Sequence, residues 1–115
     1  MGVVTSSRRQ HFEAAHAKSG LTKCMDFVLT REDYVQTKPH PEPYLTAMKR
    51  HGLCPDQCVV IEDSERGLAA ATVAGLDCII VLSEWTSDGD FNRAIAVVDG
   101  IAGVLAVVRE RMAVS

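Results

Sequence analysis

Short apolar runs alternate with longer polar stretches along the whole chain. Apolar runs occupy positions 2–5, 25–29, 58–61, 78–82 and 95–98. Runs of this length are typical of strands that are buried on both faces of a parallel sheet. Helices are predicted from Ser6 or Ser7 to about Ser19, from Pro41 or Pro43 to Gly52, from Ser64 to Gly75, and over 101–112. This alternation predicts an α/β fold with a doubly wound parallel sheet.

Particular residues mark the ends of the predicted helices. A serine hydroxyl can accept a hydrogen bond from the first amides of a helix, so Ser6 or Ser7 is expected to cap the first helix and Ser64 the third. Proline fits the first turn of a helix, where no amide donor is needed. Glycines at 20, 52 and 75 are expected to end the first three helices. The polar stretches 30–37 and 83–92 are predicted to be loops.

The composition limits the function classes that need to be considered. The chain has 115 residues, with 12 Lys and Arg against 15 Asp and Glu, which gives a net charge of −3. This length suits one domain, and the chain lacks the basic excess that would neutralise nucleic-acid phosphates. No apolar run is long enough to cross a membrane, and the N-terminus lacks a signal pattern. We therefore expect a cytoplasmic protein that binds neither nucleic acid nor membranes.

The four cysteines are too sparse for a disulfide scaffold, as expected in a reducing compartment. Three residues separate Cys54 from Cys58, and His51 is nearby, so a zinc site is conceivable. Because Cys58 and Cys78 open apolar runs, we interpret them instead as small core residues.

Residues that could bind a ligand or take part in catalysis follow three predicted strands or lie in the adjoining loops. Ligands bind at the carboxyl ends of such strands. Thr5 and Ser6 follow the first strand and could bind an anion, although helix capping alone explains them more simply. Lys38 lies in a stiff proline-rich segment and could meet a phosphate or carboxylate, or could be an ordinary solvated lysine. Glu62 and Asp63 follow a buried strand, where a hard cation such as Mg²⁺ would relieve their repulsion. The alternative is that Asp63 caps a helix and Glu62 faces solvent.

The order of these segments resembles the haloacid dehalogenase superfamily, and most of all its phosphoglycolate phosphatase and β-phosphoglucomutase branch. The resemblance is carried by Thr-Ser after a strand, then Lys-Pro-His-Pro-Glu-Pro-Tyr, then Val-Val-Ile-Glu-Asp-Ser-Glu-Arg-Gly-Leu. It implies that Thr5 and Ser6 bind the transferring phosphoryl group, that Lys38 neutralises it, and that Glu62 and Asp63 hold Mg²⁺. It also implies a phosphatase-type hydrolase that acts on a small phosphorylated metabolite through an aspartyl-phosphate.

One part of the family pattern is missing. Family members carry an Asp-x-Asp segment at the end of a central strand, and its first Asp is the nucleophile. The only Asp-x-Asp here is Asp88-Gly89-Asp90, which follows no strand directly and is predicted to be a loop turn. The family's cap domain is absent as well. We therefore expect residues 1–115 to be the C-terminal portion of a larger core domain that lacks its central strand, and expect this chain alone to be inactive.

The missing strand has a structural consequence. It would leave two strand edges without partners, so the chain must pair these strands directly, recruit another chain, or associate with itself. Two other functions are consistent with parts of the sequence. A receiver domain of a signalling system uses similar residues, but in a different order along the chain. A non-catalytic module that binds phosphate or a partner is the stronger alternative, because a fold does not guarantee a function.

Overall fold

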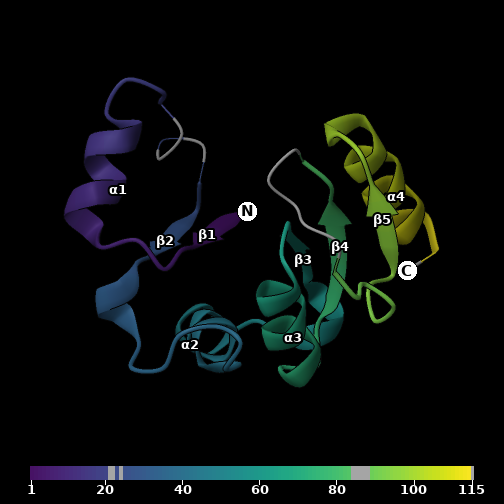
Figure 1. Ribbon diagram of the computed structural model, residues 1–115, viewed down its shortest axis with the longest axis horizontal. Helices are drawn as coiled ribbons and strands as arrows, with labels where there is room; N and C mark the ends of the chain where they lie inside the picture. The colour runs from purple at the N-terminus through teal and green to yellow at the C-terminus, as the bar shows by residue number, and fades with distance from the viewer. Residues whose placement is uncertain (21–22, 24, 84–88, 115) are drawn as a thin grey trace.

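The computed structural model describes residues 1–20, 23, 25–83 and 89–114 (Figure 1). Its strands are β1 (Gly2–Val4), β2 (Phe27–Leu29), β3 (Val59–Glu62), β4 (Asp77–Val81) and β5 (Ala96–Val98). Its helices are α1 (Arg9–His16), α2 (Glu42–His51), α3 (Glu65–Val73) and α4 (Ile101–Val114), with short 3-10 helices η2 (Arg31–Asp33) and η3 (Pro55–Gln57). This order of elements confirms the predicted α/β class.

The strands form two separate parallel sheets within the described part of the chain. β1 pairs with β2, with Val3 opposite Val28. β3, β4 and β5 form the second sheet in that order, with Ile61 opposite Ile79 and Ile80 opposite Val97. Direct pairing of β1 with β3, one of the outcomes considered from the sequence, is therefore wrong. Both strands keep an edge that is free of strand partners among the described residues.

Helix α2 links the two halves of the molecule. Figure 1 shows it below and between the two sheets, and it contacts both β1 and α3. Its Tyr44 and Met48 belong to the main hydrophobic core together with Val60 of β3 and Leu68 of α3, and Val4 of β1 packs against this cluster. Apolar packing through α2 therefore joins the sheets where backbone hydrogen bonds do not.

The start of α1 differs from the prediction. The helix begins at Arg9 with Arg8 as its N-cap, and neither Ser6 nor Ser7 caps it. Thr5 Oγ1 instead accepts a hydrogen bond from the Ser7 amide (3.1 Å), which holds this segment in a turn. The carboxylate of Glu32 accepts from the Arg9 amide (3.0 and 3.3 Å) and so satisfies the helix N-terminus from a distant segment.

The other helix ends follow local rules. Ser64 accepts a hydrogen bond from the Gly67 amide (3.1 Å) and caps α3, as predicted. Pro41 precedes α2, Pro43 lies in its first turn, and Gly52 ends it in the left-handed conformation with φ of 61°. The predicted loop 30–37 contains η2, which Thr30 and Asp33 close with a capping box. Of the predicted loop 83–92, residues 84–88 lie outside the described residues.

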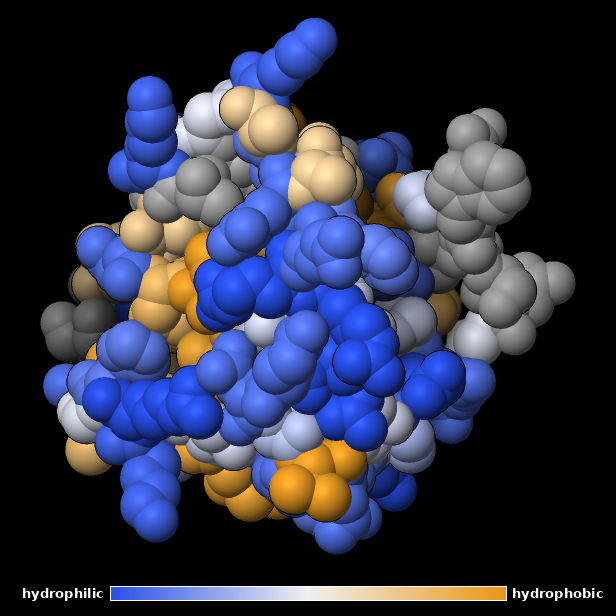
Figure 2. All heavy atoms as spheres, turned by 90° about the vertical axis from the view of Figure 1, so that its left-hand side faces the viewer, coloured by the Kyte–Doolittle hydropathy of each residue, from blue (hydrophilic) through white to orange (hydrophobic). Residues whose placement is uncertain are grey.

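The surface is unevenly apolar. Val104 of α4 is buried, but Ile101 and Met112 of the same helix are 71% and 69% exposed. On the face that carries α1 and β2, hydrophilic side chains cover most of the surface and apolar ones form smaller patches (Figure 2). Across the described residues, no helix combines the length and apolar character needed to span a membrane.

Candidate functional site

Lys38 connects the carboxyl ends of β1 and β3. Its Nζ donates to Glu62 Oε2 at 2.6 Å and to the backbone oxygen of Val4 at 3.3 Å. Val4 directly precedes Thr5, so one ammonium group brings together the three segments that the sequence singled out. The Lys38 and Glu62 side chains are only 17% and 10% exposed, which makes this a largely buried ion pair. The prediction of an ordinary solvated lysine is therefore wrong.

The carboxylate of Glu62 is held from several sides. The hydroxyl of Tyr44 donates to the same oxygen, Oε2, that accepts from Lys38. Gly67 lies against the carboxylate: a Cβ atom at that position would come within 2.1 Å of Glu62 Cδ. The ammonium of Lys38 thus supplies a cation for Glu62, and the missing side chain at Gly67 supplies the space. The alternative in which Glu62 faces solvent is wrong.

Tyr44 has a polar role in addition to its place in the hydrophobic core. Lys38 Nζ lies 5.1 Å from the centre of its ring, within the range of a cation–π contact. Burial raises the pKa of the Tyr44 hydroxyl far above its usual range, and the charge of Glu62 raises it further. The hydroxyl is therefore a proton donor at any physiological pH. A buried tyrosine needs a polar partner, and this was the only sequence signal of its role.

Arg66 also escaped the sequence analysis. Its guanidinium donates to the backbone oxygen of Lys38 (2.5 Å) and so ties the first turn of α3 to the lysine segment. The Lys38–Pro39 peptide bond is cis. Burial, and then the charge of Glu62, raise the pKa of the Cys78 thiol to about 12. Cys78 is therefore a protonated core residue beside the site, as the sequence predicted for its packing.

Thr5 occupies the place expected for an anion-binding hydroxyl at the end of β1. Its amide donates to the backbone oxygen of Leu29 (3.0 Å), and its own backbone oxygen accepts from Tyr34 (2.8 Å). These contacts fix the backbone, while Oγ1 accepts from the Ser7 amide and keeps its proton for another acceptor. Ser6 is adjacent and exposed. Glu32 already accepts from the Arg9 amide, so the start of α1 offers an anion one donor fewer than the sequence suggested.

The acids at the end of β3 have an oxygen-donor set that suits a hard cation. Asp63 is exposed next to Glu62, whose described contacts both use Oε2 and leave Oε1 for a ligand. Mg²⁺ is commonly bound by one or two carboxylates together with water and substrate phosphate. In the part of the chain that the structure describes, no three His, Cys, Asp or Glu side chains gather to hold a metal. Glu62 and Asp63 thus fit two positions of such a site, and further ligands would come from elsewhere.

Two other candidates find no support. Among the described residues, Cys54 and Cys58 belong to no group of three metal-ligating side chains, so the zinc alternative fails there. Cys54, Cys58 and Cys78 carry free thiols, whereas Cys24 lies outside the described residues. Of the lone Asp-x-Asp, Asp88 lies outside them too, and residues 89–90 belong to no strand or helix.

The model of a family described as haloacid dehalogenase-like hydrolase matches residues 1–81, which is more than half of the chain. The chain belongs to this haloacid dehalogenase-like family. The match spans the Thr5, Lys38 and Glu62–Asp63 segments on which the resemblance rested, and it leaves the receiver-domain alternative without support.

Named relatives agree with this haloacid dehalogenase-like assignment. Fructose-1-phosphate phosphatase YqaB of Escherichia coli is 38% identical over 81 residues, which cover 70% of this chain and 43% of that protein. Protein CbbY of Rhodobacter capsulatus is 33% identical over 97 residues, covering 82% of this chain and 43% of that protein. The crystal structure of CbbY from Rhodobacter sphaeroides in complex with phosphate matches with a TM-score of 0.81 at 29% identity, over 90% of this chain and 47% of that one.

The haloacid dehalogenase-like chain thus spans less than half the length of each of these relatives. The comparison shows the family and the fold of this chain.

Proposed function

We propose that this chain is the C-terminal portion of a haloacid dehalogenase-like core and that the complete protein is a Mg²⁺-dependent phosphatase acting on a small phosphate monoester. The buried Lys38–Glu62 pair at the carboxyl ends of β1 and β3 carries the proposal. Asp63 follows Glu62 and Thr5 follows Val4, which supports a site where a cation, two acids and a hydroxyl meet, as phosphoryl transfer requires. The phosphatases among the relatives support the same reaction class.

Each residue has a distinct task in this reaction. The Thr5 hydroxyl donates to a phosphoryl oxygen, with the Ser6 amide beside it, and the Lys38 ammonium offsets the charge on the equatorial oxygens. Glu62 and Asp63 hold Mg²⁺, which when bound supplies charge neutralisation at the phosphoryl group. Glu62 also orients Lys38, because the two side chains hydrogen-bond each other at 2.6 Å.

The nucleophile must come from outside these residues. An aspartate carboxylate would attack phosphorus while the second acid of the Asp-x-Asp segment protonates the leaving alkoxide. The same acid would then take a proton from the water that hydrolyses the aspartyl-phosphate to free phosphate. The unpaired edges of β1 and β3 support a strand at this position, because a strand between them would join the two sheets into one. If no such strand is present, we expect the exposed edges to drive self-association of the chain.

The setting we propose is a reducing cytoplasm. Free thiols at Cys54, Cys58 and Cys78, the cysteines that the structure describes, support it. We expect no nucleic acid or membrane among the partners, because the chain lacks a basic excess.

A phosphatase assay with an aryl phosphate and Mg²⁺ tests the proposal. The 115-residue chain is compared with the same chain extended at its N-terminus by a relative's strand and Asp-x-Asp segment. We expect negligible turnover from the first and Mg²⁺-dependent turnover from the second, abolished by Lys38→Ala. Turnover by the 115-residue chain that is lost in Lys38→Ala would contradict the need for an outside nucleophile. Reading the codons upstream of Met1 provides an independent check, because a stop codon just upstream would contradict a longer natural protein.

A non-catalytic module is the second candidate. It is favoured by the placement of Lys38, whose ammonium is already paired with Glu62 and Val4 and is not aimed at open solvent. A folded extended chain that binds inorganic phosphate without turning over substrate would select this alternative over the phosphatase.

A further inference from the structure

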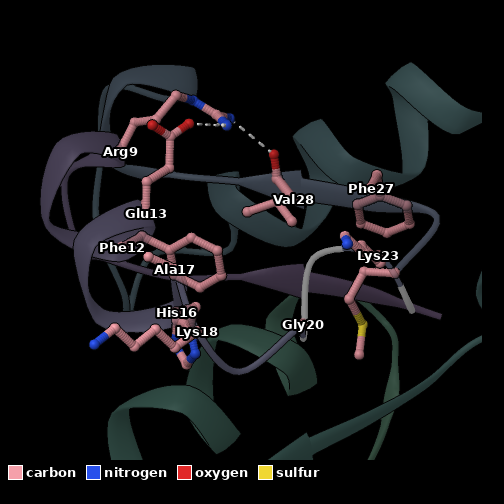
Figure 3. A pocket seen from close by; sticks show the side chains of 11 residues that line it. Arg9, Phe12, Glu13, His16, Ala17, Lys18, Gly20, Lys23, Phe27 and Val28 are labelled. Carbon is pink, nitrogen blue, oxygen red and sulfur yellow. Dashed lines mark hydrogen bonds and ion pairs between the residues drawn. The ribbon is translucent and has the colours of Figure 1, made fainter.

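A second concave site lies between α1 and β2 and shares no residue with the Lys38 site (Figure 3). Its cavity has a volume of about 670 Å³. Sites for small molecules usually measure roughly 300–1,000 Å³. Phe12 of α1 and Phe27 and Val28 of β2 form its apolar walls. The size and the walls suit a ligand with a ring or a short hydrocarbon body.

The polar part of the wall is mainly cationic. Arg9, Lys18 and Lys23 line the cavity against a single carboxylate, Glu13, although the whole chain carries a net negative charge. Arg9 is already engaged, because it donates to the backbone oxygen of Val28 (3.1 Å) and lies 3.8 Å from Glu13. Arg9 also lies 3.6 Å from Asp33, which does not line the cavity, so its guanidinium is held by contacts within the protein.

No carboxylate of the described residues lies within ion-pair distance of either Lys18 or Lys23. Lys23 lines the cavity on the side of β2, whereas in Figure 3 Lys18 extends away from the cavity. His16 adds a polarisable ring that packs against Phe12 with centroids 4.6 Å apart.

We propose that this cavity binds a small amphipathic anion, with an aromatic or aliphatic body between Phe12 and Phe27 and a carboxylate, sulfonate or phosphate group at Lys23. Apolar contact supplies most of the affinity, and the ammonium selects for negative charge. The site is independent of the proposed phosphatase activity, because it uses other elements and needs no metal.

Fluorescent probes test the proposal on the 115-residue chain. Anilinonaphthalene sulfonate has the required body and charge, and phenylnaphthylamine is its near-neutral counterpart. We expect saturable one-to-one binding of the sulfonate, at least about tenfold tighter than that of the neutral probe and weakened by salt. Equal affinity for the two probes, or no saturable binding of the sulfonate, would overturn the proposal.

Variants locate the bound probe. Lys23→Gln should weaken sulfonate binding about fivefold, as expected for one partly exposed charge contact. Lys49→Gln removes the same charge from an exposed position on α2 and should have no effect. Ala17→Trp should fill the cavity and abolish binding, with circular dichroism confirming the fold. Equal loss in Lys23→Gln and Lys49→Gln, or full binding in Ala17→Trp, would place the probe elsewhere and refute the site.

Discussion

Replacing Gly67 by alanine tests whether the space beside Glu62 is what allows the Lys38–Glu62 pair to form. The added Cβ would come within 2.1 Å of Glu62 Cδ, whereas ordinary contact begins near 3.4 Å. The carboxylate must therefore retreat by more than 1 Å. A free glutamate would do this at little cost, but this one is held by Lys38 and by Tyr44.

The expected loss of stability follows from two opposing effects. A hydrogen bond to a charged group contributes about 1.5–3 kcal/mol, and most of that is lost if the Lys38–Glu62 contact breaks. Alanine favours a helix over glycine by up to about 1 kcal/mol, which offsets part of the loss. We expect Gly67→Ala to destabilise the chain by about 1–2 kcal/mol. For a chain of this size the melting temperature should fall by roughly 4–8 °C.

Urea and thermal unfolding followed by circular dichroism measure this change. Gly100→Ala is the matched control, because a Cβ at that position meets no atom within 4 Å and the residue does not have positive φ. We expect that control to change stability by no more than about 0.5 kcal/mol, since Gly100 lies just before α4 and only its capping preference is affected.

A double-mutant cycle with Lys38→Met separates the ion pair from simple crowding. In that background the Glu62 carboxylate has one partner fewer and can move more freely, so Gly67→Ala should cost clearly less. Equal costs in the two backgrounds would refute the role of the ion pair. A Gly67→Ala protein as stable as the unmodified chain would refute the steric argument altogether.

Three further outcomes follow from other parts of the structure. Tyr44→Phe keeps the ring but removes the hydroxyl that donates to the carboxylate at the end of β3, so unfolding in urea should show a loss of about 1–2 kcal/mol. A hydrogen bond from Arg50 holds the pKa of Asp33 below its usual value, so the stabilisation from Asp33 is present above about pH 4 and is lost as pH falls through the lower, folded-state pKa. The melting temperature of Asp33→Asn should therefore fall less steeply with acidification than that of the unmodified chain, and an equally steep fall would contradict this. Burial holds the pKa of Cys78 at about 12, so peptide mapping after treatment with iodoacetamide at pH 8 should find exposed Cys54 modified and Cys78 protected until urea is added.

Much of the fold was predictable because its signals are local. The apolar runs located the five strands, because short apolar runs are typical of parallel strands. Burial on both faces holds best for β4, whereas Ile61 of β3 and Val97 of β5 are 48% and 47% exposed. Ser64 capped α3 and Gly52 ended α2 as predicted, because each acts through backbone atoms within a few residues. The order of the Thr5, Lys38 and Glu62–Asp63 segments also pointed to the family that the comparison confirmed.

The errors arose where a distant group replaced a local one. Ser6 and Ser7 are good helix caps, yet α1 begins at Arg9 and its amide is satisfied by Glu32 of η2. Ile101 and Met112 of α4 are apolar but largely exposed. Periodicity locates an apolar stripe on a helix, but it does not say whether another element covers it.

The sequence by itself determined the elements, the family and the candidate binding and catalytic residues, because these depend on residue type and short spacing. Only the tertiary structure decided how they meet. It separated β1 from β3, placed α2 between the sheets, and let Lys38 reach both Val4 and Glu62. It also brought the Tyr44 hydroxyl and the backbone of Gly67, which has no side chain to obstruct, against the Glu62 carboxylate. Contacts between residues 18 to 34 positions apart depend on packing, which no local pattern in one sequence encodes.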